Sequence, residues 1–365
     1  MGYSWGSDTT QQWTGDKGGF DYGEAEQEYD ASKAYVKNPK TATGPKLNND
    51  MSQAYEKSKV VMDAGLTAPE MELLSHLGKD DILITNGRYD SAEKVLDAVG
   101  TLYTMVNRSI DLNPNQIVLV NCPGNEFRFN YKGRSNVEAL RSFVEDGGFL
   151  VTTDWALQSV IMRGFEGYIK RGSRDTSNDL VEVDLVAEGS PYTKGLGGGS
   201  LRPVWWLESS SYPIKITRES EVDILLSSSE MGRKYNDAPI AVKFPVGQGR
   251  VVHVTSHFFL QQLHTKYEAQ AQKTGLDFAT KFLGMAQDQA EAIGELDNMA
   301  FGALESAYTS VRFMHNIFLQ KLRAREGIDQ RLLDARAMPL IGAATARTVN
   351  QLPDGRKKSQ RLLKG

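Results

Sequence analysis

Three short apolar runs, separated by amphipathic segments, constrain the fold of this 365-residue chain most strongly. They span residues 81–85, 116–120 and 149–153, and their length and flanking turn residues favour buried strands over buried helices. Between them, residues 91–106 and a segment that begins after Ser135 carry apolar side chains at helical spacing. Strands that alternate with helices across short loops predict parallel βαβ units. The expected fold is therefore α/β, with a Rossmann- or flavodoxin-like, mostly parallel sheet flanked by helices.

The second half of the chain adds more strands to this pattern. We expect them at residues 180–186, 222–226, 238–244 and 250–255. Pro239 lies in the third of these runs and places that strand at an edge or an end, because proline cannot donate a hydrogen bond to a neighbouring strand.

Composition divides the chain into four parts. Residues 1–57 are polar with interleaved aromatic residues, which predicts a disordered tail or a segment that docks on a protein partner. Residues 58–266 hold the α/β domain. Residues 267–341 have apolar side chains at helical spacing and predict a helical extension, which packs on the domain or on a partner. Residues 342–365 are polar and basic and predict a flexible tail.

Charge and cysteine content limit the function classes. The formal net charge is −4, so the overall balance does not suggest a nucleic-acid partner. Cys122 is the only cysteine, which precludes an intrachain disulfide and fits a reducing compartment. We see neither a signal peptide nor an apolar run near the ~20 residues that span a bilayer. We therefore expect a cytoplasmic protein without membrane insertion.

Four loops are expected to meet at one edge of the sheet, because ligands of parallel sheets bind beyond the carboxyl ends of the strands. These loops are residues 86–90, 121–126, 153–155 and 256–258. The candidate ligand-binding residues in them are Asn86, Gly87, Pro123, Gly124, Asp154 and Trp155.

The third loop is a turn from a strand into a helix, where a nucleophile elbow presents its reactive residue. The arrangement resembles the class I glutamine amidotransferase superfamily, with the loop 122–124 at the position of its oxyanion loop. Residues 189–196 and 246–253 look like signatures of the ThuA-like branch, and the domain also resembles non-catalytic amidotransferase-like scaffold domains. The resemblance covers residues 80–263 and implies a cysteine–histidine–carboxylate triad in the active members.

The chain departs from that triad. Asp154 and Trp155 occupy the elbow in place of cysteine, and a carboxylate is a much weaker nucleophile toward an amide. His257 is followed by Phe258 and Phe259, so the carboxylate that the family carries two residues later is missing. We therefore expect no glutaminase activity.

Several candidate catalytic residues have two interpretations. Asp154 is either a helix N-cap or an acidic group in a pocket. Cys122 is either a buried structural residue or a reactive thiol, with Glu126 and His257 as possible neighbours. His253 and His257 would lie ~13 Å apart along a strand, too far to share a metal, so we expect neither a metal nor a cofactor.

Two neighbouring tryptophans, Trp205 and Trp206, also allow two interpretations. They are either core residues or an exposed pair that binds a sugar or a peptide.

Three functions fit these observations. The first is a non-catalytic amidotransferase-like scaffold, a pseudoenzyme that binds ligands or protein partners through its N-terminal tail and C-terminal helices. The second is a carbohydrate-related, ThuA-like enzyme or sensor that uses Asp154, Glu126 and His257 for acid–base chemistry. The third is a structural protein that forms homo-oligomers through its C-terminal helices.

Overall fold

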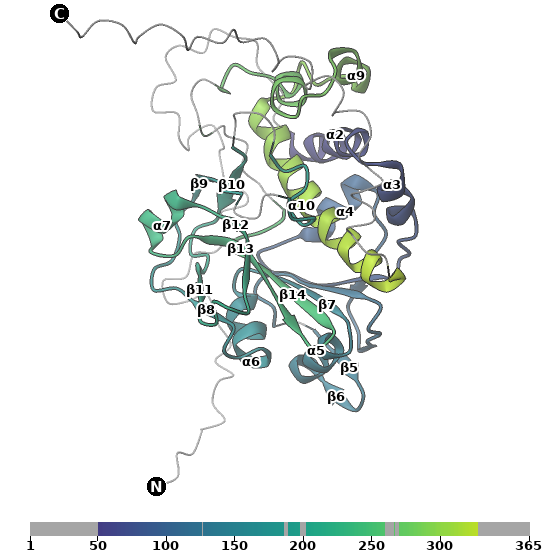
Figure 1. The fold of residues 1–365 in the computed structure, drawn as a ribbon, viewed down its shortest axis with the longest axis vertical. Coiled ribbons are helices and arrows are strands. Elements are labelled where there is room, and N and C mark those ends of the chain that lie inside the picture. Colours follow the sequence, from purple (N-terminus) through teal and green to yellow (C-terminus); the bar gives the residue numbers. More distant parts are fainter. Residues whose placement is uncertain are drawn as a thin grey trace, which may run out of the picture. The chain divides into compact units, whose positions relative to one another are not determined.

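The structure is a computed structural model, which describes residues 50–125, 127–185, 189–197, 202–259, 266 and 270–327. A seven-stranded sheet forms its centre (Figure 1). The strands stand in the order β12, β13, β14, β7, β4, β1, β2. Strands β2, β1, β4, β7 and β14 run parallel, and β13 and β12 continue the sheet antiparallel. Their bounds are β1 Ile82–Thr85, β2 Thr104–Val106, β4 Ile117–Val120, β7 Phe149–Thr153, β12 Asp223–Ser227, β13 Pro239–Val246 and β14 Gly249–Val254.

This strand order confirms the predicted fold class. The five parallel strands follow the flavodoxin-like sequence in which the chain turns back between β1 and β4. Except for the strand expected at 180–186, the expected strands are present within one or two residues of their predicted bounds. Pro239 is the first residue of β13, which agrees with its predicted place at a strand end.

One predicted helix is shorter than expected. Helix α4 spans Ala92–Val99, and Gly100 ends it in the left-handed conformation at φ 68°. A residue without a Cβ adopts this conformation at no steric cost, so Gly100 is an efficient helix stop. The chain then forms β2, which the sequence interpretation had included in the helix, and Leu102 is exposed between them.

Three small sheets surround the central one. Strands β9 (Asp179–Glu182) and β10 (Val204–Leu207) pair antiparallel, as do β8 (Ile169–Arg171) and β11 (Ile214–Ile216). A third sheet contains β3 (Ile110–Asp111), β5 (Phe129–Tyr131) and β6 (Arg134–Ser135). The expected strand at 180–186 corresponds to β9, which is shorter.

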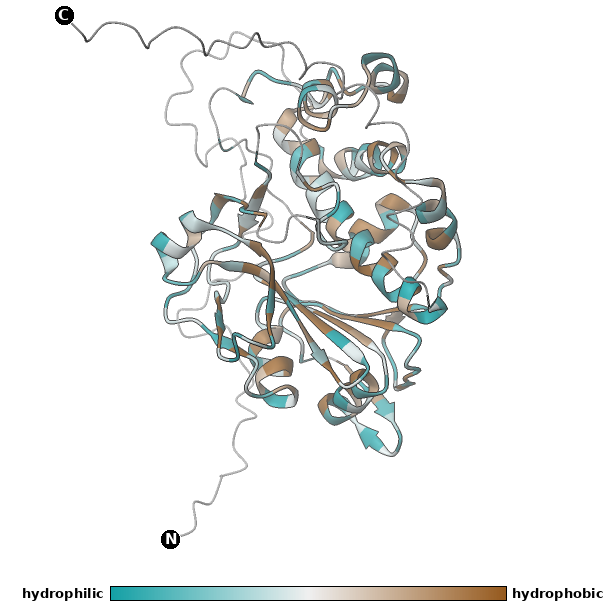
Figure 2. Ribbon diagram, in the orientation of Figure 1, coloured by the Kyte–Doolittle hydropathy of each residue, from teal (hydrophilic) through white to brown (hydrophobic). Residues whose placement is uncertain are grey.

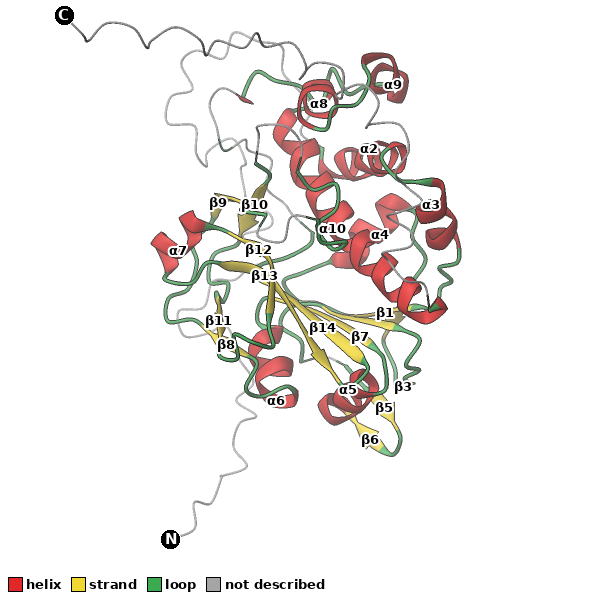
Figure 3. Cartoon of the chain, viewed as in Figure 1, coloured by secondary structure: helices red, strands yellow, loops and turns green. Residues whose placement is uncertain are grey.

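Helices cover both faces of the central sheet (Figure 3). One face carries α5 (Asn136–Glu145), the π-helix η2 (Leu157–Ile161) and α6 (Met162–Gly164). The other carries α4 and α10 (Phe301–Glu326), with α2 (Met51–Ala64) and α3 (Ala68–Ser75) beyond them. Apolar residues gather on the strands and on the inner sides of the helices (Figure 2). The remaining helices are α7 (Ser229–Tyr235), α8 (Gly275–Asp277), η4 (Phe278–Phe282) and α9 (Gln287–Ile293).

The chain divides into two compact units, residues 1–322 and residues 323–365. Within the first unit, the described part of the predicted helical extension up to Leu322 packs on the domain. Phe313 of α10 contacts the rings of Trp205 and Phe258, with centroids 6.3 and 6.2 Å away. Trp205 and Trp206 are buried, so they are core residues and not an exposed pair. The apolar side chains of α10 up to Leu322 are buried as well, so this helix packs on the domain.

The N-terminal boundary also differs from the prediction. Helix α2 begins at Met51, capped by the Asp50 side chain, so residues 51–57 are helical rather than part of a tail. Ala54 and Tyr55 are fully buried and explain why this segment is ordered.

The rest of the predicted tail, residues 1–49, and the basic segment 342–365 lie outside the described residues. In the described part of the chain, no helix combines the length and apolar character that crossing a membrane requires.

Candidate functional site

The four predicted loops do meet at the carboxyl ends of β1, β4, β7 and β14. The backbone N–H groups of Arg88 and Tyr89 donate to the carbonyl of Cys122, at 3.0 and 3.3 Å, which joins the loops after β1 and β4. The Cys122 N–H donates to Thr153 Oγ1 at 3.1 Å and joins the loops after β4 and β7. The polar side chains on these loops therefore face one another because the parallel strands end side by side.

Asp154 occupies a sharp turn directly after β7. Its φ of 45° is in the left-handed region, which costs a non-glycine residue about 1–3 kcal/mol and is common at functional sites. Its Oδ1 accepts from the Tyr212 N–H at 2.9 Å, and its Oδ2 accepts from Ser211 Oγ at 3.0 Å. The carboxylate points to these residues and not to the following helix, so the N-cap interpretation is wrong and Asp154 is a buried acidic group.

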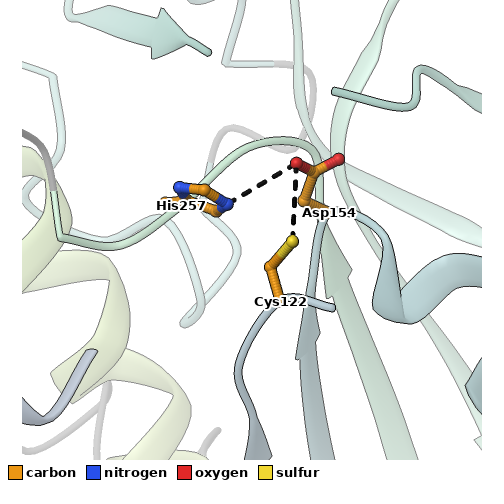
Figure 4. A group of neighbouring side chains, drawn as sticks. All are labelled: Cys122, Asp154 and His257. Atoms are coloured by element: carbon orange, nitrogen blue, oxygen red, sulfur yellow. Dashed lines mark hydrogen bonds and ion pairs between the residues drawn. The ribbon is translucent and has the colours of Figure 1, made fainter. Parts of the chain in front are cut away.

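His257 lies after β14 between two carboxylates. Its Nδ1 pairs with the Glu208 carboxylate, and its Nε2 lies 3.5 Å from Asp154 Oδ2 (Figure 4). Burial alone would lower the pKa of His257, but the charges of Glu208 and Asp90 and the contact with Asp154 outweigh it, so that the pKa lies well above its usual value. The family resemblance had suggested that His257 lacks a carboxylate partner. Glu208 supplies one from a different part of the chain.

Cys122 completes the group from the third side. It precedes a cis peptide bond to Pro123, and its Sγ lies 3.9 Å from Asp154 Oδ2 (Figure 4). Burial and the negative charge of Asp154 raise the pKa of the thiol to about 12. A free thiolate is therefore disfavoured near neutral pH in this arrangement, which makes Cys122 a poor nucleophile by itself.

The three side chains have the chemistry and spacing of a metal site. Cys122 Sγ, Asp154 Oδ2 and His257 Nε2 lie within 4.8 Å of one another. Metal bonds of 2.0–2.3 Å in a tetrahedral site place neighbouring ligand atoms about 3.3–3.8 Å apart, so a small contraction would fit the group to a cation. We expected no metal, from the spacing of His253 and His257. The set found here instead combines residues from three different strand ends.

The electrostatics of the group also favour a cation. His257 Nε2 is buried and makes no hydrogen bond, although Asp154 Oδ2 is its neighbour. Glu208 pairs with the opposite nitrogen, Nδ1, so a proton would stay there while a bound cation displaces the proton that the raised pKa keeps on Nε2. Asp90 adds a further buried carboxyl, and burial raises its pKa. Among the described residues, His257 therefore faces the carboxyl groups of Asp154, Glu208 and Asp90.

The sequence interpretation missed Glu208 and left the role of Asp90 open. Glu208 follows β10, which belongs to a separate two-stranded sheet, so nothing in the βαβ pattern connects it to His257. The only available signal was an acidic residue directly after an apolar strand. The sequence allows the same two interpretations of Asp90 as of Asp154, a helix cap or an acidic group in a pocket. Asp90 Oδ1 accepts from the N–H of the next residue, Ser91, at 2.8 Å, but the side chain is buried among the site residues.

The other predicted ligand-binding residues border the group. Asn86 is exposed, whereas Gly87 and Gly124 are packed so closely that a Cβ would lie 2.1 Å from Asp90 O and 2.8 Å from Ala156 Cβ, respectively. Pro123 and Trp155 are half-buried. Glu126 lies outside the described residues.

Comparisons with known proteins find only distant structural similarity. No family model and no curated protein sequence matches the chain. A solved structure of a putative ThuA-like protein from Bacteroides uniformis is 14% identical, with a TM-score of 0.33 over 50% of this chain and 84% of that one. A cytoplasmic protein from Salmonella typhimurium is 16% identical, with a TM-score of 0.32 over 51% of this chain and 91% of that one.

An exo-β-1,4-mannosidase from an Opitutaceae bacterium is 12% identical, with a TM-score of 0.30 over 48% of this chain. The match spans only 31% of the mannosidase. Similarities this low do not identify a family, a substrate or an activity.

Proposed function

We propose that the protein is a metal-dependent hydrolytic enzyme whose reaction centre is a divalent transition metal, zinc in the first instance, held by Cys122, Asp154 and His257. The observation that carries this proposal is the convergence of three buried ligand atoms of different chemistry within 4.8 Å at the carboxyl edge of the sheet. Thiolate, imidazole and carboxylate are the ligand types that zinc takes in proteins. Three protein ligands leave one position for water, which is typical of catalytic and not of structural zinc sites.

Each neighbouring residue has a role in this proposal. Glu208 orients His257 through Nδ1, and Ser211 together with the Tyr212 N–H orients the Asp154 carboxylate. Such hydrogen-bonded neighbours fix the direction of metal ligands and commonly contribute 10–100-fold to metal affinity or activity. A bound divalent cation would favour the thiolate of Cys122 and lower the pKa of a bound water, which supplies a nucleophile for hydrolysis.

Metal content provides the first test. The full chain is purified without chelator, and bound metals are quantified by mass spectrometry alongside absorption spectra of the cobalt-substituted protein. We expect about one metal per chain and a thiolate–cobalt charge-transfer band that Cys122→Ser abolishes. His253→Asn, which changes a buried histidine outside the group, is the matched control and should retain both. A wild-type chain that binds no metal, or a Cys122→Ser variant that binds it equally well, would overturn the proposal.

Turnover provides the second test. We expect hydrolysis of p-nitrophenyl acetate or p-nitrophenyl phosphate that stops after chelation and returns with added Zn²⁺. Turnover that survives complete removal of metal would contradict a metal-dependent reaction.

A non-catalytic ligand- or partner-binding protein is the second candidate. The observation that favours it is the low exposure of the three side chains, 1% for Cys122, 3% for Asp154 and 2% for His257. A chain that binds metal stoichiometrically but hydrolyses neither substrate would support this function. The cation would then stabilise a binding domain.

A further inference from the structure

A row of aromatic side chains lies beside the proposed metal site. Trp155 stands between Tyr89 and Tyr212, with ring centroids 5.2 and 5.6 Å away. The contact with Tyr89 is edge-on and the contact with Tyr212 is stacked. All three rings are half-buried, in contrast to the buried side chains of the ligand group.

The backbone connects each ring to a residue of the ligand group. Trp155 directly follows Asp154, the N–H of Tyr212 holds Asp154 Oδ1, and the N–H of Tyr89 donates to the Cys122 carbonyl. The Trp155 Nε1–H also donates to the Ser210 carbonyl at 2.8 Å, which fixes the ring in place. The row is therefore positioned by the same loops that position the ligand atoms.

An arginine stands at each end of the row. The Arg88 guanidinium lies 5.6 Å from the Tyr89 centroid, and the Arg171 guanidinium lies 3.9 Å from the Tyr212 centroid. Arg171 is already engaged, since one of its nitrogens lies 2.8 Å from both carboxylate oxygens of Asp175. Arg88 is exposed and forms no ion pair with any residue in the described ranges, which makes it the cation available to an incoming anion.

We propose that this row, Arg88–Tyr89–Trp155–Tyr212, is the recognition surface for a small ring compound that carries a phosphate or a carboxylate. Half-exposed aromatic rings provide apolar contact for a sugar or a base, and a guanidinium binds phosphate or carboxylate with good geometry. Arg88 is exposed at the end of the row beside Tyr89, so the anionic part of the compound binds there. This inference rests on the proposed function, because the row borders the centre where a bound compound would react.

Binding is measured by titration calorimetry with the full chain, both zinc-loaded and chelator-treated, so that binding at the row is separated from binding at the metal. The probes are glucose 6-phosphate and adenosine monophosphate. The control compounds are glucose and adenosine, which lack the charge, and inorganic phosphate, which lacks the ring. We expect at least one phosphorylated ring compound to bind the chelator-treated chain about tenfold more tightly than its uncharged parent and than inorganic phosphate, a difference of about 1.4 kcal/mol. Which of the two probes binds distinguishes a sugar from a nucleotide.

Variants then locate the binding surface. Arg88→Ala should weaken binding about tenfold with partial recovery in Arg88→Lys, and Tyr212→Leu should weaken it while keeping the N–H that holds Asp154. The controls are Arg233→Ala and Tyr103→Leu, outside the row, which should bind as wild type. Equal binding by Arg88→Ala, inorganic phosphate as tight as the ring compounds, or no binding of either probe would overturn the inference. Metal content measured on the same samples shows separately whether the proposed metal site fails.

Discussion

His253 and His257 lie four residues apart, yet the interior of the sheet and its carboxyl edge shift the pKa of a histidine in opposite directions. His253 lies within β14 and His257 lies just beyond it, and both are essentially fully buried. Burial lowers the pKa of His253 to about 3, and its ring contacts Thr152 Oγ1 at 2.8 Å. At His257 the same desolvation is outweighed by carboxylates, and the pKa rises well above its usual value.

The difference comes from what each region can bring near a buried ring. Within the sheet, neighbouring strands supply mainly apolar and hydroxyl side chains, so a histidine there is neutral and structural. Beyond the strand ends, loops from distant parts of the chain converge and place Asp154 and Glu208 on the two ring nitrogens. Burial alone therefore does not predict charge, whereas position relative to the strand ends does.

The largest expected effect is on stability when His257 is removed. His257→Leu in the chelator-treated protein leaves the carboxylates of Asp154 and Glu208 without their cation in a buried site. Loss of one partner from a buried charge pair typically costs 3–5 kcal/mol, and the partial exposure of Glu208 places the expected loss near the lower end, about 3 kcal/mol. Urea denaturation at pH 7 measures it. A loss below about 1 kcal/mol would mean that the carboxylates are not charged as described.

His253→Leu should have a smaller effect. It removes no charge at neutral pH and leaves the Thr152 hydroxyl without its partner, which costs about 1–3 kcal/mol. The double variant His253→Leu, Thr152→Val should recover part of the loss, because both polar groups are then absent. If the double variant is less stable than the sum of the two single variants, the paired hydroxyl–imidazole description is wrong.

The pH dependence of stability should have opposite signs for the two histidines. His257 has a raised folded-state pKa, so its contribution is complete below about pH 6.5, the unfolded value, and is lost as the pH rises through the folded-state pKa. His253 has a lowered pKa, so its contribution is present above about pH 6.5 and is lost as the pH falls toward 3. Each histidine changes the free energy of unfolding by at most about 1.4 kcal/mol per pH unit.

Denaturation of wild type, His257→Gln and His253→Gln across pH 4–9 would separate the two contributions. The difference between wild type and His257→Gln should shrink as the pH rises, and the difference for His253→Gln should shrink as the pH falls. Parallel curves for all three proteins would show that neither pKa is shifted.

The smallest effect concerns the backbone beside His257. Both Tyr55 Oη of α2 and Ser310 Oγ of α10 donate to the Phe258 carbonyl, at 3.0 and 2.5 Å. Tyr55→Phe and Ser310→Ala should each cost about 1 kcal/mol, and each leaves the other donor in place. A combined loss clearly larger than the sum, seen by thermal denaturation, would show that the carbonyl depends on having at least one donor.

Much of the fold followed from the sequence, because buried strands and their helices have a clear periodicity. The four loops at the sheet edge were predicted for the same reason, and with them Cys122, Asp154 and His257. Helix 91–106 was overextended because its apolar spacing continued past Gly100, whose role as a stop was overlooked. Glu208 could not be predicted, since its approach to His257 depends on how a separate two-stranded sheet packs against the domain.

The shared carbonyl of Phe258 has a consequence for the limits of the domain. Its two donors, Tyr55 and Ser310, come from helices at opposite ends of the described chain, both outside the segment 58–266 that the sequence assigned to the α/β domain. A fragment cut at those limits would lose both donors at the residue next to His257. A fragment that lacks either helix and proves inactive would therefore say nothing about the chemistry of the site.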